Sequence, residues 1–555
     1  MRAALLLLCL LAAPAGAEPG RLERVQAVLP EIDKMYADLA EKEHLPGLAY
    51  GVVLDGKLIH VRTLGLANLD DKIPVTKDSL FRVASMTKSF VVMAALKLRD
   101  EGKLKLDDPV SKYLPALRGL RLPTSDSPPL TIAMLMTMST GLPEDNPWGD
   151  RQMTVSNAAF DKLFRGGLSF STAPGTGYEY SNLGFIMLGK LVSKVAGMRY
   201  QDYISAKILK PLGMHSTVWE YGKVPKDKLA LGYRWLDKAW VAEPILHDGD
   251  GAAMGGLIST IDDYGRYIAF HLDAWPARDG AETGPLKRAS VREMHMPRVF
   301  GATIPENQQV TFYGYGMRWT RDFKNLATVG HSGGLPGFGS QYRFAPEYGI
   351  GVVAFTNLRY GPVYQPTIDA LGTLVVKAKL PIRPAPGSDI LTRRAVQVAQ
   401  LIQSWDEALG KEIAADNFFL DYAREEWIAK AGAAFANIGK VTAVGPVRPL
   451  NALRGSFTIT GELGELDVSF TLTPEQQPKL QELDLRRVPV VVVRQESYSI
   501  LGREMATVGE LTAWLKAQGI KKVAVRVASD DDYTQIGKLI YGCQRVGIEL
   551  KLPDM

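Results

Sequence analysis

Residues 81–90 read Phe-Arg-Val-Ala-Ser-Met-Thr-Lys-Ser-Phe and contain the only Ser-x-x-Lys of the chain, Ser85 and Lys88. Because residues three apart share one face of a helix, a helix that begins here places the hydroxyl beside the amine. The serine then stands at the positive end of the helix dipole, and a buried lysine can lose its charge and accept the hydroxyl proton. Taken alone, the four residues also fit a serine that caps an apolar helix.

A second segment, Tyr180-Ser181-Asn182, follows Pro174–Gly177 and precedes an apolar stretch with the character of a helix. In this segment the tyrosine hydroxyl is able to share a proton with Lys88, and the Asn182 amide is able to hold a substrate carbonyl. The alternative is a tyrosine that packs its ring at the end of a strand.

A third segment, His331-Ser332-Gly333-Gly334, stands at the predicted end of a strand. Its glycines would let a substrate backbone pair along the strand edge, and an amide there can point into an oxyanion hole. A glycine turn after a strand is the alternative. Residues 330–334 also match the Gly-x-Ser-x-Gly elbow of other hydrolases, but that motif requires a later histidine, and all seven histidines lie at or before His331.

In this order the three segments resemble the serine β-lactamase and penicillin-binding protein superfamily, which combines Ser-x-x-Lys, Tyr-x-Asn and Lys-Thr-Gly. The surrounding residues are similar to its class C-like peptidase and esterase branch, in LMTMSTGLP (135–143), PGTGYEYSNLGFIMLG (174–189) and GHSGGLPGF (330–338). The resemblance covers roughly residues 30–380. It implies an α+β, β-lactamase-like fold with an antiparallel sheet flanked by helices and an all-helical subdomain.

The resemblance also implies a role for each residue of the three segments. Ser85 would be the nucleophile, with Lys88 and Tyr180 as its proton-relay bases, and Asn182 would orient the substrate carbonyl. The backbone N–H groups of Ser85 and Gly334 would form the oxyanion hole. The substrate-binding and oxyanion set implied in this way is Asn182, His331, Ser332, Gly333 and Gly334.

His331 occupies the position that a lysine holds in the third motif of the superfamily. A histidine is shorter and mostly neutral at pH 7, so we expect a weaker grip on a substrate carboxylate. This departure argues against an efficient β-lactamase, whereas His-[Ser/Thr]-Gly is familiar among the D-amino-acid peptidases and esterases of the branch.

Alternation and helical periodicity predict the elements around these segments. A helix is expected over Arg21–Glu43, and strands over 47–54 and 57–64 flank an Asp55-Gly56 hairpin turn. Further helices are expected over about 183–197 and 261–272, and further strands over 313–320, 327–331, 341–345 and 349–356. Strands from both ends of this region therefore build one sheet, with helices inserted between them.

The composition narrows the classes of function. The 555 residues are 46% hydrophobic with a net charge of +5 and no dense basic block, which excludes a mostly disordered chain and argues against nucleic acid as a partner. Cys9 and Cys543 are the only cysteines, which excludes a disulfide scaffold and a cysteine-built metal site. We expect no metal and no cofactor.

The N-terminus has the pattern of an export signal. Met1-Arg2 precedes an apolar run to Ala13, and Ala15-Gly16-Ala17 fits a cleavage site. We therefore expect a signal peptide over residues 1–17 and a periplasmic or secreted protein. No segment is long and apolar enough for a membrane span.

The C-terminal third follows a proline-rich linker at 380–387 that ends the hydrolase domain, 18–380. Residues 389–486 are expected to form an α+β accessory domain. Residues 487–555 resemble the periplasmic domain of the ExbD/TolR family and are expected to form a small α/β domain. That resemblance implies self-association or docking to another protein, with no catalytic residue.

These observations together predict an exported serine hydrolase that acts through an acyl-enzyme on small peptides, with D-amino acids expected, or on esters. A promiscuous carboxylesterase or weak β-lactamase using the same site is one alternative. A non-catalytic ligand-binding or sensor protein is another.

Overall fold

The structure is a computed structural model that describes residues 20–494, 497–501, 503–527 and 533–552. The expected signal peptide lies outside these ranges. Two compact units divide the described residues, one from Gly20 to Arg383 and one from Pro384 onward. Within them, no helix combines the length and the apolar character needed to cross a membrane.

The N-terminal unit is built on a nine-stranded sheet in the order β3-β2-β1-β13-β12-β11-β10-β9-β8. As the sequence predicts, the sheet joins strands from both ends of the region, because β1 pairs antiparallel with β13 and Leu48 lies opposite Thr356. Its strands are β1 (Gly47–Leu54), β2 (Lys57–Asn68), β3 (Ile73–Pro74), β8 (Val299–Ile304), β9 (Gln309–Tyr313), β10 (Arg318–Asp322), β11 (Ala327–Leu335), β12 (Phe338–Ala345) and β13 (Ile350–Thr356).

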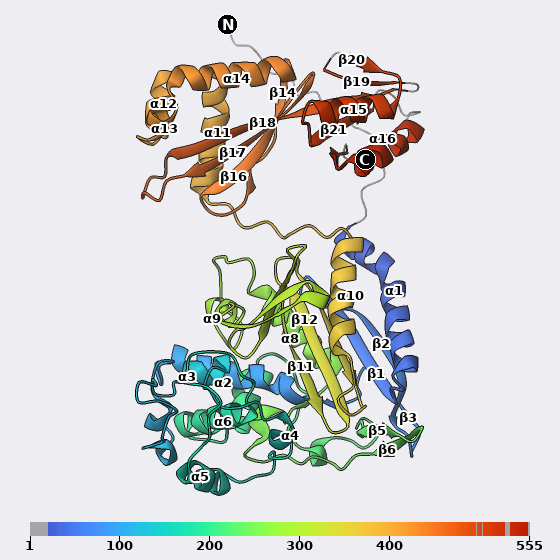
Figure 1. Ribbon diagram of the computed structural model, residues 1–555, viewed down its shortest axis with the longest axis vertical. Helices are drawn as coiled ribbons and strands as arrows, with labels where there is room; N and C mark the ends of the chain where they lie inside the picture. Colours follow the sequence, from blue (N-terminus) through green and yellow to red (C-terminus); the bar gives the residue numbers. More distant parts are fainter. Residues whose placement is uncertain (1–19, 495–496, 502, 528–532, 553–555) are drawn as a thin grey trace. The chain divides into compact units, whose positions relative to one another are not determined.

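Helices cover both faces of this sheet (Figure 1). On one face, α1 (Arg21–Lys42) packs beside α10 (Tyr364–Lys377), and on the other α8 (Ile261–Asp273) crosses β1, β2 and β13. The expected N-terminal helix forms because its apolar residues recur at helical spacing and face the sheet. The residues of this stripe are Val25, Val28, Leu29, Ile32 and Tyr36.

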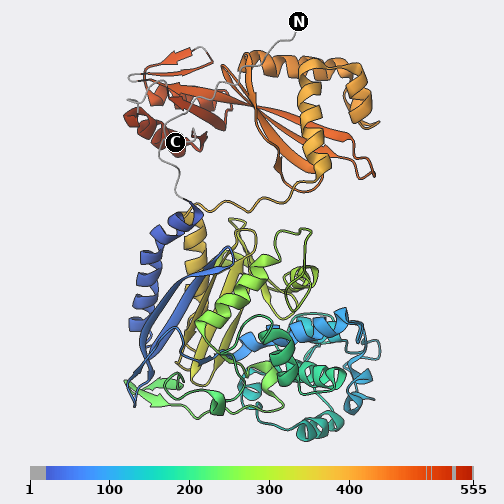
Figure 2. The same cartoon turned by 180° about the vertical axis from the view of Figure 1, so that it is seen from behind.

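A helical subdomain is inserted between the two halves of the sheet (Figure 2). Its helices are α2 (Thr87–Asp100), α3 (Ile132–Thr137), α4 (Asn146–Gly149), α5 (Asn157–Gly166), α6 (Asn182–Ala196) and α7 (Tyr200–Ile204). Both α6 and α7 pack against α2, which is buried on nearly every face. The start of α2 is therefore held firmly, and this matters because Ser85 and Lys88 lie there.

The unit also contains a short helix and two short two-stranded ribbons. Helix α9 (Arg288–Met294) packs against α8, and two short ribbons pair β4 (Phe81–Arg82) with β7 (Ile258–Ser259) and β5 (Tyr233–Leu236) with β6 (Ala239–Ala242). The β4–β7 ribbon leads directly into the segment that carries Ser85.

Two strand predictions were wrong in detail. The single strand expected over 313–320 is a hairpin instead, because Gly316 has a φ of +70° and turns the chain between β9 and β10. The strand expected to end at His331 continues to Leu335, so the glycines of the third segment lie within β11. The turn follows at residues 336–337, which explains why no helix begins after Ser332.

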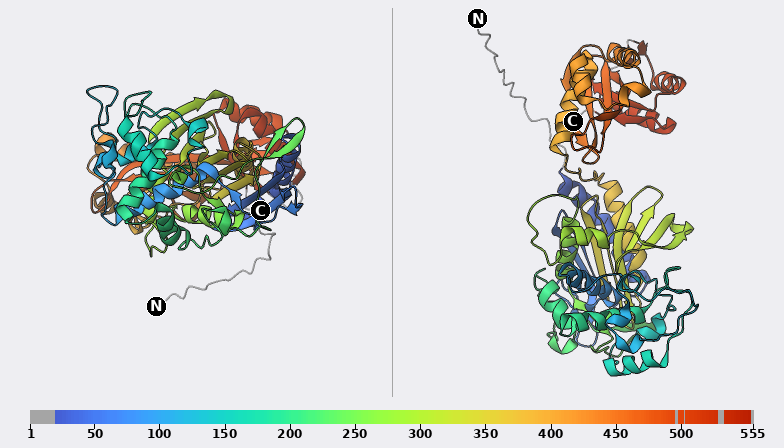
Figure 3. Two further views of the ribbon diagram at one scale, coloured as in Figure 1. Left: turned by 90° about the horizontal axis from the view of Figure 1, so that it is seen from below. Right: turned by 90° about the vertical axis from the view of Figure 1, so that its left-hand side faces the viewer.

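The C-terminal unit packs helices against a second sheet (Figure 3). Its helices are α11 (Asp389–Ser404), α12 (Glu407–Ile413), α13 (Phe418–Asp421), α14 (Arg424–Ile438), α15 (Val508–Ala517) and α16 (Tyr533–Val546). Its strands are β14 (Val441–Val444), β15 (Arg448–Pro449), β16 (Arg454–Gly461), β17 (Gly464–Leu472), β18 (Leu480–Val493), β19 (Tyr498–Ile500), β20 (Arg503–Met505), β21 (Lys522–Val527) and β22 (Glu549–Lys551).

Strand β18 runs through both halves of this unit. Its residues 480–489 pair with β17, and its residues 490–493 pair in parallel with β21. The boundary expected between residues 486 and 487 therefore falls inside one continuous strand. Cys543 is buried among the apolar residues of the second half and forms no disulfide.

Candidate active site

Ser85 lies in a 3₁₀ turn, Ala84–Met86, immediately before α2. Ala84 has a φ of +50°, in the left-handed region that costs free energy for a residue with a side chain. Such strain is found where the surrounding structure enforces a particular geometry, and here it sets the serine at the N-terminal end of the helix.

Lys88 lies one turn further along and is fully buried. Its Nζ lies 2.9 Å from Ser85 Oγ, 2.7 Å from Asn182 Oδ1 and 2.6 Å from the carbonyl oxygen of Met254. The three hydrogen-bonding directions of the amine are thus all used, and the first two segments meet as the sequence predicts.

Burial lowers the pKa of Lys88 to about 7, although the negative charges of Asp150 and Asp145 favour the ammonium form. Desolvation outweighs this attraction because the amine has no carboxylate in direct contact within the described part of the chain. A neutral amine next to a serine hydroxyl is therefore well populated at neutral pH, and it can act as a base.

Tyr180 contacts both members of this pair in different ways. Lys88 Nζ lies 4.9 Å from the centroid of the Tyr180 ring. Burial raises the pKa of Tyr180, and a hydrogen bond with Ser85 opposes this effect. The Tyr180 hydroxyl therefore interacts with Ser85, and the expected proton sharing between this hydroxyl and Lys88 stays a prediction.

Asn182 begins α6, and its position is fixed from both sides. Its backbone N–H donates to Asp145 Oδ1 at 2.6 Å, and the next N–H, of Leu183, donates to Asp145 Oδ2 at 2.8 Å. These bonds satisfy free donors of the helix N-terminus. The Oδ1 of Asn182 accepts from Lys88 and its Nδ2 donates to Asn146 Oδ1 at 3.1 Å, so the buried Asn182 positions the amine and does not itself line the pocket.

His331 is buried beneath β11 and does not line the pocket at Ser85. Its Nε2 lies 2.9 Å from the Tyr313 hydroxyl, and its Nδ1 lies 2.6 Å from the carbonyl oxygen of Ser332. Burial and the charge of Lys88 lower its pKa, so the ring is neutral. Nδ1–H must then donate to the carbonyl, and Nε2 accepts from Tyr313. The His331 ring does not line the pocket, and the substrate-binding role that the resemblance implied stays a prediction.

The rest of the third segment offers an open strand edge. Strand β10 pairs with β11 only as far as Gly330, which lies opposite Arg318, and no strand among the described residues pairs with residues 331–335 on that side. A Cβ at Gly333 would lie 2.3 Å from the carbonyl oxygen of Val83, so only glycine allows β11 to approach the turn that carries Ser85.

A pocket of about 450 Å³ unites the segments. From the predicted set, Ser85, Tyr180, Ser332 and Gly334 line it. The residues that sequence reasoning missed are Glu144, Asn146, Asp150, Tyr178, Glu179, Arg318 and Tyr360. Tyr178 and Glu179 lie in the quoted stretch 174–189, and the other five belong to none of the three segments.

Four of the missed residues carry charge, namely Glu144, Asp150, Glu179 and Arg318. Arg318 is half-buried, donates from Nη2 to the Tyr178 hydroxyl at 2.9 Å, and has no carboxylate partner among the described residues. Asp150 is buried and accepts a hydrogen bond from the Tyr360 hydroxyl at 2.9 Å. Burial raises the pKa of Asp150 to about 6. The pocket thus offers a cation and a carboxylate near the nucleophile.

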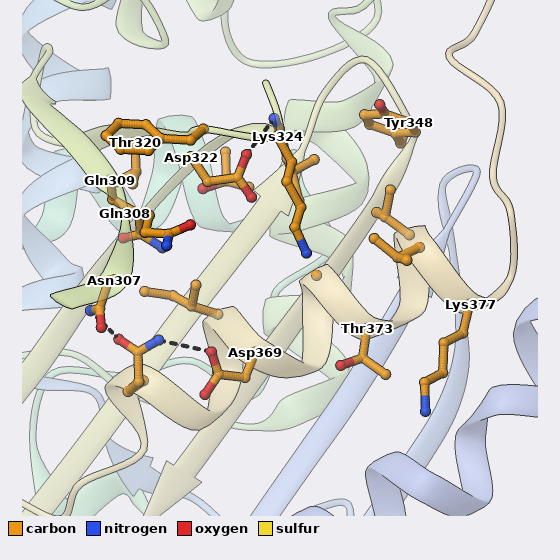
Figure 4. A pocket seen from close by; sticks show the side chains of 18 of the residues that line it. Asn307, Gln308, Gln309, Thr320, Asp322, Lys324, Tyr348, Asp369, Thr373 and Lys377 are labelled. Atoms are coloured by element: carbon orange, nitrogen blue, oxygen red, sulfur yellow. Dashed lines mark hydrogen bonds between the residues drawn. The ribbon is translucent and has the colours of Figure 1, made fainter. Parts of the chain in front are cut away.

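A larger groove of about 640 Å³ lies elsewhere, between α10 and strands β9 and β10 (Figure 4). Residues such as Gln309, Thr320 and Asp369 line it, and Lys324 points into it. Neither Ser85 nor Lys88 lines this groove. The smaller pocket at Ser85 is therefore the candidate active site, although the groove has the larger volume.

Comparisons with known proteins agree with this geometry. The family model described as Beta-lactamase matches residues 32–377. "Protein flp" of Staphylococcus aureus (strain N315) is 29% identical over 356 residues, which are 63% of this chain and 67% of that protein. "Beta-lactamase-like protein 2" of Dictyostelium discoideum is 31% identical over 262 residues, or 45% of this chain and 47% of that protein.

Solved structures show the same fold. The octameric penicillin-binding protein homologue from Pyrococcus abyssi has a TM-score of 0.54 at 21% identity, covering 86% of this chain and 98% of that one. The penicillin binding protein from Bacillus halodurans has a TM-score of 0.50 at 25% identity, covering 61% and 98%. Since the family model spans more than half of the sequence, the chain belongs to the beta-lactamase family, within the superfamily of serine hydrolases that includes penicillin-binding proteins.

Proposed function

We propose that this chain is an exported serine hydrolase that forms an acyl-enzyme on Ser85 and cleaves small peptides next to a C-terminal carboxylate, with a D-amino acid at that end. The observation that carries the proposal is the 2.9 Å contact between Lys88 Nζ and Ser85 Oγ at a pocket that Arg318 also lines.

The acylation step follows from the site. Neutral Lys88 accepts the proton of Ser85 as Oγ bonds to the substrate carbonyl carbon. The oxyanion that forms is stabilised by the backbone N–H groups of Ser85 and Gly334, next to the positive end of α2. The amine leaves when Lys88 returns the proton to it, and the Tyr180 hydroxyl, which hydrogen-bonds to Ser85, is placed to assist that transfer.

Two features support a peptide as the substrate. The free edge of β11 over residues 331–335 can pair with an extended peptide backbone, in the manner of strand addition. Arg318 lines the pocket, no carboxylate of the described residues binds it, and a guanidinium pairs well with a carboxylate. A simple ester has no group for Arg318, which favours the peptidase over the esterase.

The neutral, buried His331 supports the same choice. The superfamily motif has a lysine at this position, and this chain replaces its charge with an uncharged ring below the strand. Arg318 would then be the residue that binds an anionic group of the substrate. This arrangement supports a peptidase with weak activity toward β-lactams.

The proposal is tested on the full chain with a fluorescent penicillin or a fluorophosphonate, followed by intact mass and peptide mapping. We expect one adduct, on Ser85, and none with Ser85→Ala at an unchanged melting temperature. Rates are then compared for matched dipeptides with a D- or L-residue and a free or amidated C-terminus. We expect the free-carboxylate D-peptide to be cleaved fastest, and equal rates for free and amidated peptides would contradict the role of Arg318.

The proposal also covers export of the chain and the role of its C-terminal region. If residues 1–17 are a signal peptide, N-terminal sequencing of protein produced in a bacterium that exports it will begin at Glu18. We propose self-association or protein docking through residues 487–555, supported by the ExbD/TolR resemblance. Light scattering of the purified full chain measures self-association directly. If the chain is strictly monomeric, residues 487–555 do not mediate self-association, and docking to another protein is the part of the proposal that stands.

A further inference from the structure

Tyr360 adopts a costly backbone conformation at the edge of the pocket. Its φ is +49°, a left-handed value that is unfavourable for a residue with a side chain. This conformation lays the ring against β11, where a Cβ on Gly334 would lie 2.9 Å from Tyr360 Cδ1. The phenol hydroxyl then reaches across the pocket and donates to Asp150 Oδ2 at 2.9 Å.

Asp150 approaches the site from the opposite wall. It follows α4, and the preceding Gly149 packs so closely on Asn182 that a Cβ there would lie 2.6 Å from Asn182 Cβ. Asn182 in turn binds Lys88. The carboxyl group therefore lies next to the catalytic pair, and its Oδ1 has no hydrogen-bond partner among the described residues.

Hydrolysis of an acyl-enzyme needs a base that a water molecule in the pocket can reach. Lys88 is fully buried, does not line the pocket, and has all three of its bonding directions occupied. Tyr180 lines the pocket, but its raised pKa keeps it a neutral phenol. A carboxylate that lines the pocket is therefore more accessible to that water than Lys88 and a stronger base than the neutral Tyr180.

Asp150 meets the requirement that these two do not. The charged and titratable groups that act on its carboxyl are Tyr360, Lys88, Asp145 and Arg151. Burial raises its pKa to about 6, so the carboxylate predominates at pH 7 and is still a stronger base than an ordinary aspartate. It is buried, anchored at one oxygen and open at the other.

We propose that Asp150 is the general base of deacylation. Its Oδ1 takes a proton from a water molecule while the water oxygen bonds to the acyl carbonyl carbon. The tetrahedral intermediate collapses as the bond between that carbon and Ser85 Oγ breaks, and Asp150 returns the proton to Oγ. The product acid leaves and Asp150 is again a carboxylate. Tyr360 is a positioning residue that holds the carboxyl group in place. The assignment rests on the acyl-enzyme proposed above.

The test separates acylation from deacylation in the full chain by stopped-flow with p-nitrophenyl acetate. In Asp150→Asn we expect the burst of p-nitrophenol within about threefold of that of the unmodified chain, and a steady-state rate lower by roughly 100-fold or more, as for loss of a general base. Intact mass should show the acetyl group accumulating on Ser85. Tyr360→Phe should slow the steady state less, and Asp150→Glu should restore part of it.

Asp369→Asn is the matched control, because it makes the same chemical change at an exposed carboxylate on α10, in the larger groove of Figure 4. We expect no change in either phase. In the unmodified chain the deacylation rate should fall as the pH is lowered, with a midpoint near pH 6, because Asp150 becomes protonated there. This midpoint should be missing in Asp150→Asn.

Two results overturn the assignment. One is an Asp150→Asn variant that deacylates at the original rate. The other is an equal loss of burst and steady-state rates at an unchanged melting temperature, which would make Asp150 a residue that only positions Lys88. A chain with no burst and no adduct on Ser85, in any variant, would instead refute the proposed function itself.

Discussion

The pKa of Lys88 makes a quantitative prediction about the pH dependence of acylation. Burial lowers this pKa from 10.5 to about 7. At pH 7 about half of the amines are then neutral, against roughly one in three thousand for a lysine with an ordinary pKa. Burial therefore raises the concentration of the active base by about 10³ at pH 7.

The sign of the effect follows from the step that the base performs. Only the neutral amine can accept the Ser85 proton, so the acylation rate should rise tenfold per pH unit below pH 7 and level off above it. Asp150 favours the ammonium form, so Asp150→Asn should move the midpoint to lower pH. Lys88→Met removes the base and should lower acylation by roughly 10² to 10⁴ at pH 7, with no midpoint near 7.

The measurement is the single-turnover burst with p-nitrophenyl acetate between pH 5 and 9, corrected for hydrolysis by buffer. Far-ultraviolet circular dichroism at each pH confirms that the fold is retained. A flat profile in the unmodified chain, or a midpoint above pH 9, would refute the idea that a desolvated Lys88 is the base. A midpoint that moves upward in Asp150→Asn would refute the electrostatic part of the reasoning.

Three further predictions concern recognition and stability. Arg318→Gln should raise KM for a peptide with a free carboxylate at least tenfold and leave KM for the amidated peptide unchanged; equal effects on both would contradict a carboxylate contact. Gly333→Ala should destabilise the chain by roughly 1–3 kcal/mol in urea unfolding, since its Cβ would meet the Val83 carbonyl oxygen at 2.3 Å; an unchanged midpoint would show that β11 can move away. The buried pair His271 and His295, 2.8 Å apart, has lowered pKa values, about 3 for His295, so the unfolded chain gains protons first as the pH falls below 6.5. The free energy of unfolding should then fall by about 1.4 kcal/mol per pH unit for each histidine between pH 6 and 4, and a flat profile would contradict this.

Local rules account for what the sequence predicted well. The spacing of Ser85 and Lys88 predicts a shared helical face, and the structure places Nζ and Oγ 2.9 Å apart. The Asp55-Gly56 turn predicts the β1–β2 hairpin, because both residues adopt a positive φ there. These features depend on neighbours within a few residues, which is the range over which a sequence pattern acts.

The pocket residues that sequence patterns did not predict are placed by contacts between residues far apart in the chain. Asp150 and Tyr360 are 210 positions apart, and neither lies in a recognisable motif. Arg318 faces the pocket because β9 and β10 form a hairpin that places it opposite Gly330, whereas the sequence predicts one uninterrupted strand there. Their positions depend on the register of the sheet and on a strained loop, and no local pattern of apolar residues reports either.

The two carboxylates near Lys88 differ in a way that decides how the site can be tested. The negative charge of Asp145 favours the ammonium form of Lys88. Asp145 also accepts hydrogen bonds from two backbone N–H groups at the start of α6. Its removal would therefore disturb the helix that carries Asn182. Fold and catalysis cannot be separated at that position. Among the described residues the Asp150 side chain accepts from no backbone N–H and binds the Tyr360 hydroxyl alone, so its loss removes a charge and the proposed base without removing a helix cap. A change in rate at Asp150 therefore reports on chemistry, and the same change at Asp145 would not.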